Sequence, residues 1–170
     1  MDTALNKKHS GTETEKEYEI IHLEKTKKGC GLCEKYSSTK AAGNNNIAVM
    51  SCEGGCLRGE ISRRVANSLC FNYYPEKTAR VCLGGAFTKD TGQRNMVRSA
   101  ARVIALEGCS IDCASRMMNG VIPNLEPEVI HVDKYYTFNT TLFAINEVSE
   151  EELEKYTTEA VSKIKEIIAL

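Results

Sequence analysis

The sequence predicts an α/β fold, with a three-layer, Rossmann-like domain built on a mostly parallel sheet of about four or five strands. Three observations predict it. Short apolar runs alternate along the chain with longer segments whose apolar residues recur at helical spacing. Several of these runs stop abruptly at glycine and cysteine, which is typical of strands that end in tight loops. The length of 170 residues is enough for one such domain with its own core.

The first predicted strand–turn–helix unit lies in the sequence NIAVMSCEGGCLRGE. Residues 47–50 form a short apolar run, and residues 51–56 form a turn rich in glycine and cysteine. A helix is expected from Leu57, because Leu57, Ile61, Val65 and the residues that continue this spacing give one apolar face.

The middle of the chain supplies two further strands and two further helices. A strand is expected over residues 78–83, followed by Gly84-Gly85 and a helix over residues 91–101. The next strand covers residues 103–106, and a short helix follows over residues 114–119. Alternation of this kind favours parallel strands joined by helices that cover the sheet.

The last unit is a strand over residues 129–136 and a C-terminal helix that opens at Ser149. Glu152, three residues after Ser149, predicts a capping box.

The N-terminal part divides the chain into residues 1–36, expected to be a flexible segment, and residues 37–170, expected to be the α/β domain. Residues 1–17 are polar with little to bury, which is typical of poor order. Residues 18–23 are compatible with an edge strand or one helical turn, and residues 37–46 with a linker. Between them lies a Cys-x2-Cys knuckle, Cys30 and Cys33, which is a common half-site for zinc or iron–sulfur.

Composition excludes several classes of partner. The net charge is −1, from 22 basic and 23 acidic side chains, and no basic stripe with interleaved aromatic residues is present. Nucleic acid is therefore not an expected partner. No apolar run approaches the ~20 residues of a membrane helix, and the first residues lack the apolar core of a secretory signal. We expect a cytoplasmic protein that does not enter a membrane.

Cysteines provide the clearest functional signal. There are eight of them: Cys30, Cys33, Cys52, Cys56, Cys70, Cys82, Cys109 and Cys113. In a reducing cytosol such a set favours metal binding or thiol chemistry over disulfides. Three of them, Cys52, Cys82 and Cys109, stand at the carboxyl ends of predicted strands, and in open sheets of parallel strands ligands bind at that edge. Cys70 instead falls on the apolar face of the first helix, so we expect it in the core.

The spacing of these motifs resembles the DGC family, the zinc-binding proteins named after an Asp-Gly-Cys motif. The matching segments are Cys52-Glu-Gly-Gly-Cys56, Cys82-Leu-Gly-Gly and Glu107-Gly-Cys109-Ser-Ile-Asp-Cys113, within about residues 46–136. Glu107 stands where the family has its naming aspartate. The resemblance implies metal binding through the cysteines, without implying a particular reaction.

The first four expected ligands are Cys52, Cys82, Cys109 and Cys113, with Cys56 next, and Zn²⁺ is the expected metal. Cys30 and Cys33 either complete this site or bind a second metal. An iron–sulfur cluster, which thiolates also hold, is the alternative cofactor. Four thiolates would make a structural site, whereas three with an open position would make a catalytic one; both stay open.

Two residues near the expected site have alternative roles. Asp112 either supports a metal ligand through a hydrogen bond or is an acid at a helix N-terminus. His131 alternates with apolar residues on a strand, so we expect it to be packed or half-exposed rather than a ligand.

An enzymatic alternative rests on Cys52 and Arg58. A Cys-x5-Arg loop between a strand and a helix is similar to the phosphate loop of low-molecular-weight tyrosine phosphatases and arsenate reductases. That similarity implies a catalytic thiolate at Cys52, an oxyanion held by Arg58, and a small anion or thiol substrate. Asp133 would match the late general acid, although Gly59 and Lys134 depart from the pattern of those enzymes.

Overall fold

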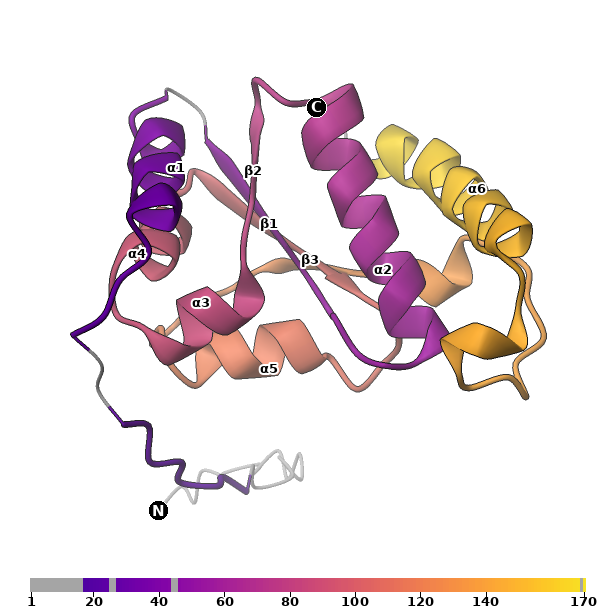
Figure 1. Ribbon diagram of the computed structural model, residues 1–170, viewed down its shortest axis with the longest axis horizontal. Coiled ribbons are helices and arrows are strands. Elements are labelled where there is room, and N and C mark those ends of the chain that lie inside the picture. Colours follow the sequence, from indigo (N-terminus) through magenta and orange to yellow (C-terminus); the bar gives the residue numbers. More distant parts are fainter. Residues whose placement is uncertain (1–16, 25–26, 44–45, 169) are drawn as a thin grey trace, which may run out of the picture.

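The computed structural model describes residues 17–24, 27–43, 46–168 and 170. Its centre is a four-stranded sheet in the order β2-β1-β3-β4, and every pair of neighbouring strands is parallel (Figure 1). The strands are β1 (Ile47–Ser51), β2 (Thr78–Arg80), β3 (Arg102–Glu107) and β4 (Glu128–His131). Helices flank the sheet, so the prediction of a three-layer α/β fold is confirmed.

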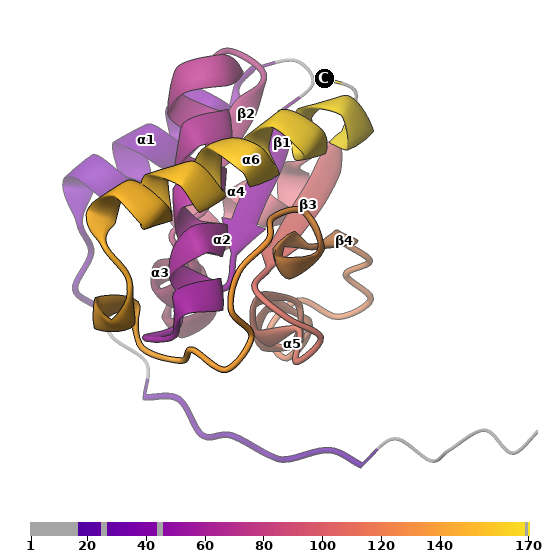
Figure 2. The same cartoon turned by 90° about the vertical axis from the view of Figure 1, so that its right-hand side faces the viewer.

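Two groups of helices make the outer layers. The main helices are α1 (Gly31–Ala41), α2 (Leu57–Ser68), α3 (Leu83–Thr88), α4 (Gly92–Ser99), α5 (Cys113–Asn119) and α6 (Glu150–Ile168). Shorter elements are the π-helical turn η1 (Leu69–Tyr73) and the 3-10 turns η2 (Val132–Lys134) and η3 (Ile145–Glu147). Helices α2 and α6 cover one face, and Figure 2 shows α6 lying across α2. Helices α3, α4 and α5 cover the other face, with α1 packed against α4.

Strand alternation divides the core between the two faces. Ile47 and Val49 of β1 join the cluster under α2 and α6, whereas Ala48 and Met50 join the cluster under α3, α4 and α5. Met50 is fully buried, and burying a side chain of this size contributes about 1.5–3 kcal/mol. Because both faces are covered, β1 is apolar from Ile47 to Met50 rather than alternating with polar residues.

The connections create a switch point between β1 and β3. The chain leaves β1 toward α2 on one face, and it leaves the neighbouring strand β3 toward α5 on the other face. The loops after these strands therefore diverge at the carboxyl edge of the sheet, which is where open α/β sheets bind ligands. Figure 1 shows that α2, α3 and α5 all start at this edge.

The elements differ from the sequence predictions in four places. Strand β2 ends at Arg80, and residues 83–88 form α3 instead of continuing the strand. Strand β4 ends at His131, after which the chain turns in η2. Helix α1 crosses the expected boundary between residues 36 and 37, so the linker interpretation is wrong for residues 37–41. Residues 17–24 are neither helix nor strand, and residues 1–16 lie outside the described part of the chain.

Two other expectations can be compared directly with the structure. The capping box at the last helix is confirmed, because the Ser149 N–H donates to Glu152 Oε2 and the Glu152 N–H donates to Ser149 Oγ. Within the described residues, no helix has both the length and the apolar character needed to span a membrane.

Candidate functional site

Four cysteines lie at the carboxyl ends of three adjacent strands. Cys52 directly follows β1, and Cys82 follows β2 as the N-cap of α3. Cys109 lies in the loop after β3, and Cys113 is the first residue of α5. Because β1 lies between β2 and β3, the strand order brings these positions to one edge rather than separating them.

Cys52 is the most enclosed of the four. Its side chain is 6% exposed, and this burial raises the pKa of its thiol to about 11. The backbone N–H groups of Gly54 and Gly108 oppose this rise in pKa, whereas negative charge on Cys113 or Glu107 adds to it. Cys52 and Cys113 are therefore close enough for the charge state of one thiol to affect the other.

Glu107 fixes the start of α5. Its side chain is fully buried at the end of β3, and it accepts hydrogen bonds from the Ala114 N–H (3.2 Å), the Ser115 N–H (2.7 Å) and the Ser115 hydroxyl (2.8 Å). A carboxylate at a helix N-terminus satisfies N–H groups that have no partner within the helix. Glu107 thereby ties β3 to the turn that begins with Cys113.

Glycines allow the loops of this edge to approach one another. A Cβ atom on Gly108 would lie 2.8 Å from the backbone carbonyl of Arg58, and one on Gly59 would lie 2.7 Å from the backbone nitrogen of Gly54. The end of β3, the first turn of α2 and the loop after Cys52 are thus in backbone contact. This contact explains why glycine follows Glu107 in the Glu-Gly-Cys sequence.

Arg80 holds the opposite side of the Cys52 loop. Its guanidinium is buried and donates to Ser51 Oγ (2.7 Å), to Glu53 and to Asn67 Oδ1 (3.0 Å). Ser51 and Glu53 flank Cys52 in the chain, so one cation fixes both neighbours of the thiol. Such a network also keeps a buried charge paired and hydrogen-bonded, as burial requires.

Cys56 acts as the N-cap of α2. Its sulfur accepts a hydrogen bond from the Gly59 N–H at 3.4 Å, and its backbone pairs with Ala144 in an isolated bridge. Cys56, the next candidate ligand after the first four cysteines, therefore already has a structural role in the described conformation.

Arg58 turns toward the segment after β4. It donates to the Thr140 carbonyl (3.3 Å), lies 3.9 Å from an Asp133 carboxylate oxygen, and stacks over Phe138 at 5.0 Å. Arg58 and Asp133 are thus neighbours, as the enzymatic alternative requires, but the guanidinium is held by residues 133–140.

Tyr136 lies beside this group. Its side chain is 5% exposed, and its hydroxyl has no hydrogen-bond partner among the described residues. Burial raises the pKa of this hydroxyl, and the Asp133 charge adds to the rise while the Arg58 charge opposes it.

A histidine–carboxylate pair borders the β3–α5 loop. His131 Nε2 lies 2.7 Å from Asp112 Oδ1, and both side chains are partly exposed. Asp112 has a positive φ of 56°, a left-handed conformation that non-glycine residues seldom adopt. The expectation that His131 is packed or half-exposed is confirmed, and Asp112 is its partner. The pair links the end of β4 to the residue before Cys113.

The remaining cysteines lie elsewhere. Cys70 is 2% exposed in η1, within the cluster under α2 and α6, which confirms its assignment to the core. Cys30 is the N-cap of α1 and Cys33 lies in its first turn. Figure 1 shows α1 beside α4, across the molecule from α2.

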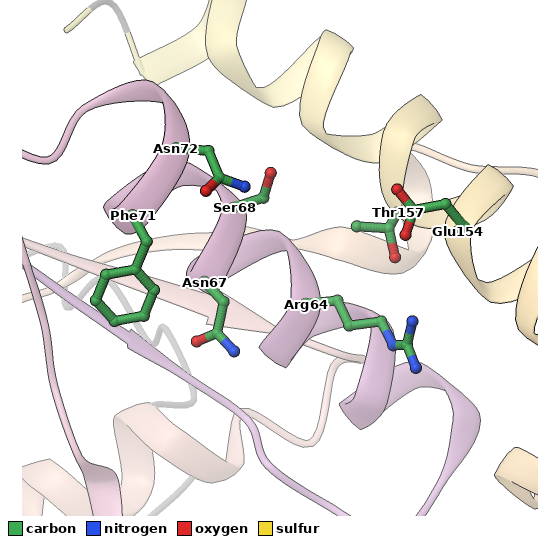
Figure 3. A pocket seen from close by; sticks show the side chains of 7 residues that line it. All are labelled: Arg64, Asn67, Ser68, Phe71, Asn72, Glu154 and Thr157. Atoms are coloured by element: carbon green, nitrogen blue, oxygen red, sulfur yellow. The ribbon is translucent and has the colours of Figure 1, made fainter.

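The cysteines at this edge are not arranged as a complete metal site in the described conformation. Among the described residues, no three Cys, His, Asp or Glu side chains are grouped closely enough to hold a metal ion. A hollow whose lining includes none of Cys52, Cys82, Cys109 and Cys113 lies between α2, η1 and α6, with Arg64, Phe71 and Glu154 among its lining residues (Figure 3).

Sequence reasoning missed Arg80, Tyr136 and the His131–Asp112 pair as parts of this edge. Arg80 carried one usable signal, since a charged residue inside the apolar strand 78–83 must find a buried partner. The places of Tyr136 and of the His131–Asp112 pair depend on contacts between distant segments, so no local sequence pattern indicates them.

Comparison with known proteins adds one finding. The family model described as the DGC domain matches residues 48–163 of the 170-residue chain. Searches of curated proteins and of solved structures give no significant match.

Proposed function

The chain belongs to the DGC-domain family, and from this premise and the thiols at the carboxyl edge we propose that it binds a metal ion, with zinc as the first choice. The observation that carries the proposal is the Cys52–Cys113 pair. The charge of Cys113 raises the pKa of the Cys52 thiol, and the N–H groups of Gly54 and Gly108 oppose that rise, so two thiols from different loops lie near each other at the switch point.

The donor types fit the proposed metal. Thiolates suit Zn²⁺, and hydrogen bonds from N–H groups to a ligating sulfur support its negative charge. Cys52 and Cys113 would be the first two ligands, and Cys109, on the same loop as Cys113, would be the third. Cys82 is the fourth candidate because it lies at the end of the adjacent strand β2. Metal binding would require these four sulfurs to move closer to one another, since among the described residues no three metal-ligating side chains lie close enough to share an ion.

A bound Zn²⁺ would supply positive charge that stabilises the thiolates, and with an open position it would also act as a Lewis acid. The protein residues do the rest. The N–H groups of Gly54 and Gly108 lower the pKa of Cys52 and so favour its thiolate, and Glu107 holds the helix that begins with Cys113. Arg80 fixes the residues on both sides of Cys52.

Metal content after purification without oxygen tests the proposal. We expect about one equivalent per chain by elemental analysis, and loss of most of it in Cys52→Ser and Cys113→Ser, because each removes one thiolate from the same ion. Cys70→Ser is the matched control: it also removes a buried thiol but lies in the α2–α6 core, so its metal content should stay unchanged. Wild-type protein without metal, whose thiols at this edge all react freely, would overturn the proposal.

The same measurement separates the two cofactors. Iron with acid-labile sulfide would identify a cluster, whereas zinc without sulfide would identify a mononuclear site. The oxyanion-binding alternative rests on the proximity of Arg58 and Asp133. It would require the Arg58 guanidinium to leave Phe138 and Thr140 and to turn toward an anion beside Cys52.

A further inference from the structure

A second thiol pair lies outside the region that matches the DGC domain. Cys30 and Cys33 are the N-cap and the third residue of α1, in the sequence Cys-Gly-Leu-Cys, whereas the match begins at residue 48. Cys30 is exposed and Cys33 is half-buried. The two sulfurs therefore differ in access, although they lie in one helical turn.

The backbone geometry suits a disulfide between them. Residues three apart in a helical turn have Cα atoms about 5 Å apart, from the rise and radius of the helix. That separation falls inside the range of about 4.4–6.8 Å found across disulfides. The N-cap conformation of Cys30 is extended (φ −97°, ψ 109°), so its side chain is outside the regular helical ladder. The Cys30 sulfur makes no capping hydrogen bond that a disulfide would break.

The first turn of α1 is anchored to the domain. Glu34, the residue after Cys33, accepts a hydrogen bond from the Thr91 hydroxyl (2.8 Å) and lies 3.5 Å from the Lys89 ammonium. The ammonium also lies 2.6 Å from the position that a Cβ atom of Gly29 would take. The turn that carries the cysteine pair is therefore tied to the segment between α3 and α4, and a lysine ammonium lies beside Gly29, the residue before Cys30.

We propose that Cys30 and Cys33 form a reversible dithiol–disulfide couple that exchanges with low-molecular-weight disulfides. The Cys30 thiolate attacks the disulfide R–S–S–R, forms a mixed disulfide with one R–S group and releases the other as a thiolate. The Cys33 thiolate then attacks the Cys30 sulfur and releases the second R–S⁻. Two protein thiols lose two protons and two electrons, and one small disulfide becomes two thiols. Exposed Cys30 is the nucleophile, and half-buried Cys33 is the resolving thiol.

Peptide mapping gives a direct test. Trypsin cleaves after Lys28 and Lys35, so residues 29–35 form one peptide that contains both cysteines and no others. Full-length protein is equilibrated with glutathione disulfide and reduced glutathione, and its free thiols are alkylated. After digestion with trypsin, mass spectrometry measures the mass of this peptide. We expect the wild-type peptide to be lighter by two hydrogens, to carry neither glutathione nor alkyl group, and to return to the dithiol with dithiothreitol.

Two single variants test the roles of the sulfurs. Cys33→Ser should accumulate glutathione on Cys30, because no thiol remains to resolve the mixed disulfide. Cys30→Ser should carry at least about tenfold less glutathione on Cys33, since that sulfur is less accessible. Circular dichroism should show that both variants keep the wild-type helix content.

Other outcomes would overturn the inference. These are a wild-type peptide that stays reduced or keeps glutathione under the same conditions, or equal glutathione uptake by the two variants. Metal content keeps this result separate from the proposed function, because Cys30→Ser should leave it unchanged while Cys52→Ser should lower it.

Discussion

Replacing Glu107 tests how the carboxyl edge is built. In Glu107→Ala the N–H groups of Ala114 and Ser115 lose their acceptor inside the protein, since Ala114 is fully buried and Ser115 is 5% exposed. Each buried N–H left without a partner costs about 1–3 kcal/mol, and the space vacated by the side chain adds to the loss. We therefore expect Glu107→Ala to lower the free energy of unfolding by about 3–5 kcal/mol.

Two further variants provide the scale. Glu107→Gln keeps the volume and one acceptor oxygen but turns an amide donor toward an N–H group, so its cost should fall between that of alanine and wild type. Glu152→Gln is the matched control, because it also alters a side chain that caps a helix, but on the exposed side of α6. Its expected cost is about 0.5–1 kcal/mol.

Urea denaturation of metal-free protein, followed by far-ultraviolet circular dichroism, measures these free energies. The m-values should stay constant, so that shifts of the midpoint report stability. A cost below about 1 kcal/mol for Glu107→Ala, or one no larger than that of Glu152→Gln, would refute the assignment of Glu107 as the anchor of α5.

Three other experiments test the core, the proposed metal site and the oxyanion alternative. Cys70→Ala should cost on the order of 1 kcal/mol in thermal melts and leave metal content unchanged, because its sulfur packs in the core. Metal affinity should rise with pH between 7 and 9, by about tenfold per pH unit for each proton released. The reason is that the raised pKa of Cys52 leaves a proton on its sulfur that the metal must displace. Competition titrations with a chelator measure this dependence, and an affinity that does not change with pH would contradict it. If the oxyanion alternative holds, arsenate should protect Cys52 from alkylation and Arg58→Lys should abolish the protection, whereas no protection at millimolar anion would remove that alternative.

The raised pKa of Cys52 also determines how the free energy of unfolding of the metal-free protein changes with pH. The ordinary value for the thiol is 9.0, and the folded value is about 11. Below pH 9 both the folded and the unfolded chain hold the Cys52 proton, so the contribution of this thiol to folding stability is fully present. Between pH 9 and 11 the unfolded chain releases the proton before the folded chain does, so this contribution is lost. The total is about 2–3 kcal/mol, visible as the difference between wild type and Cys52→Ser.

The sheet and the cysteines at its carboxyl edge could be predicted because their signals are local. Apolar runs that stop at glycine and cysteine mark strand ends, and parallel strands bring those ends to one side. Cys70 could be assigned to the core because its helical spacing places it with Ile61 and Leu69.

The missed elements depend on contacts between distant parts of the chain. The two glycines at 84 and 85 predict a turn after a strand over residues 78–83, but burial of Leu83 and Ala86 under the sheet stabilises a helix over residues 83–88. Residues 37–41 have the polar composition of a linker but belong to α1, in which the Tyr36 hydroxyl accepts a hydrogen bond from the backbone N–H of Arg80, 44 positions away. Such tertiary contacts override weak local propensity.

The pairings that shape the thiol site share this property. Arg80 meets Glu53 only because β2 lies beside β1, and Asp112 meets His131 only because β4 lies beside β3. Strand order is a global property, so these pairs could not be read from spacing.

X-ray absorption at the metal edge of the full-length protein, purified without oxygen, tests the central claim most directly. A zinc site built from the thiols after β1 and β3 predicts a shell of sulfur scatterers at about 2.3 Å, with at least three sulfurs per ion. Cys113→Ser should lower the sulfur count or remove the metal, and Cys70→Ser should leave the spectrum unchanged. A first shell made only of nitrogen and oxygen at about 2.0–2.2 Å, or a spectrum that Cys113→Ser does not alter, would contradict the account.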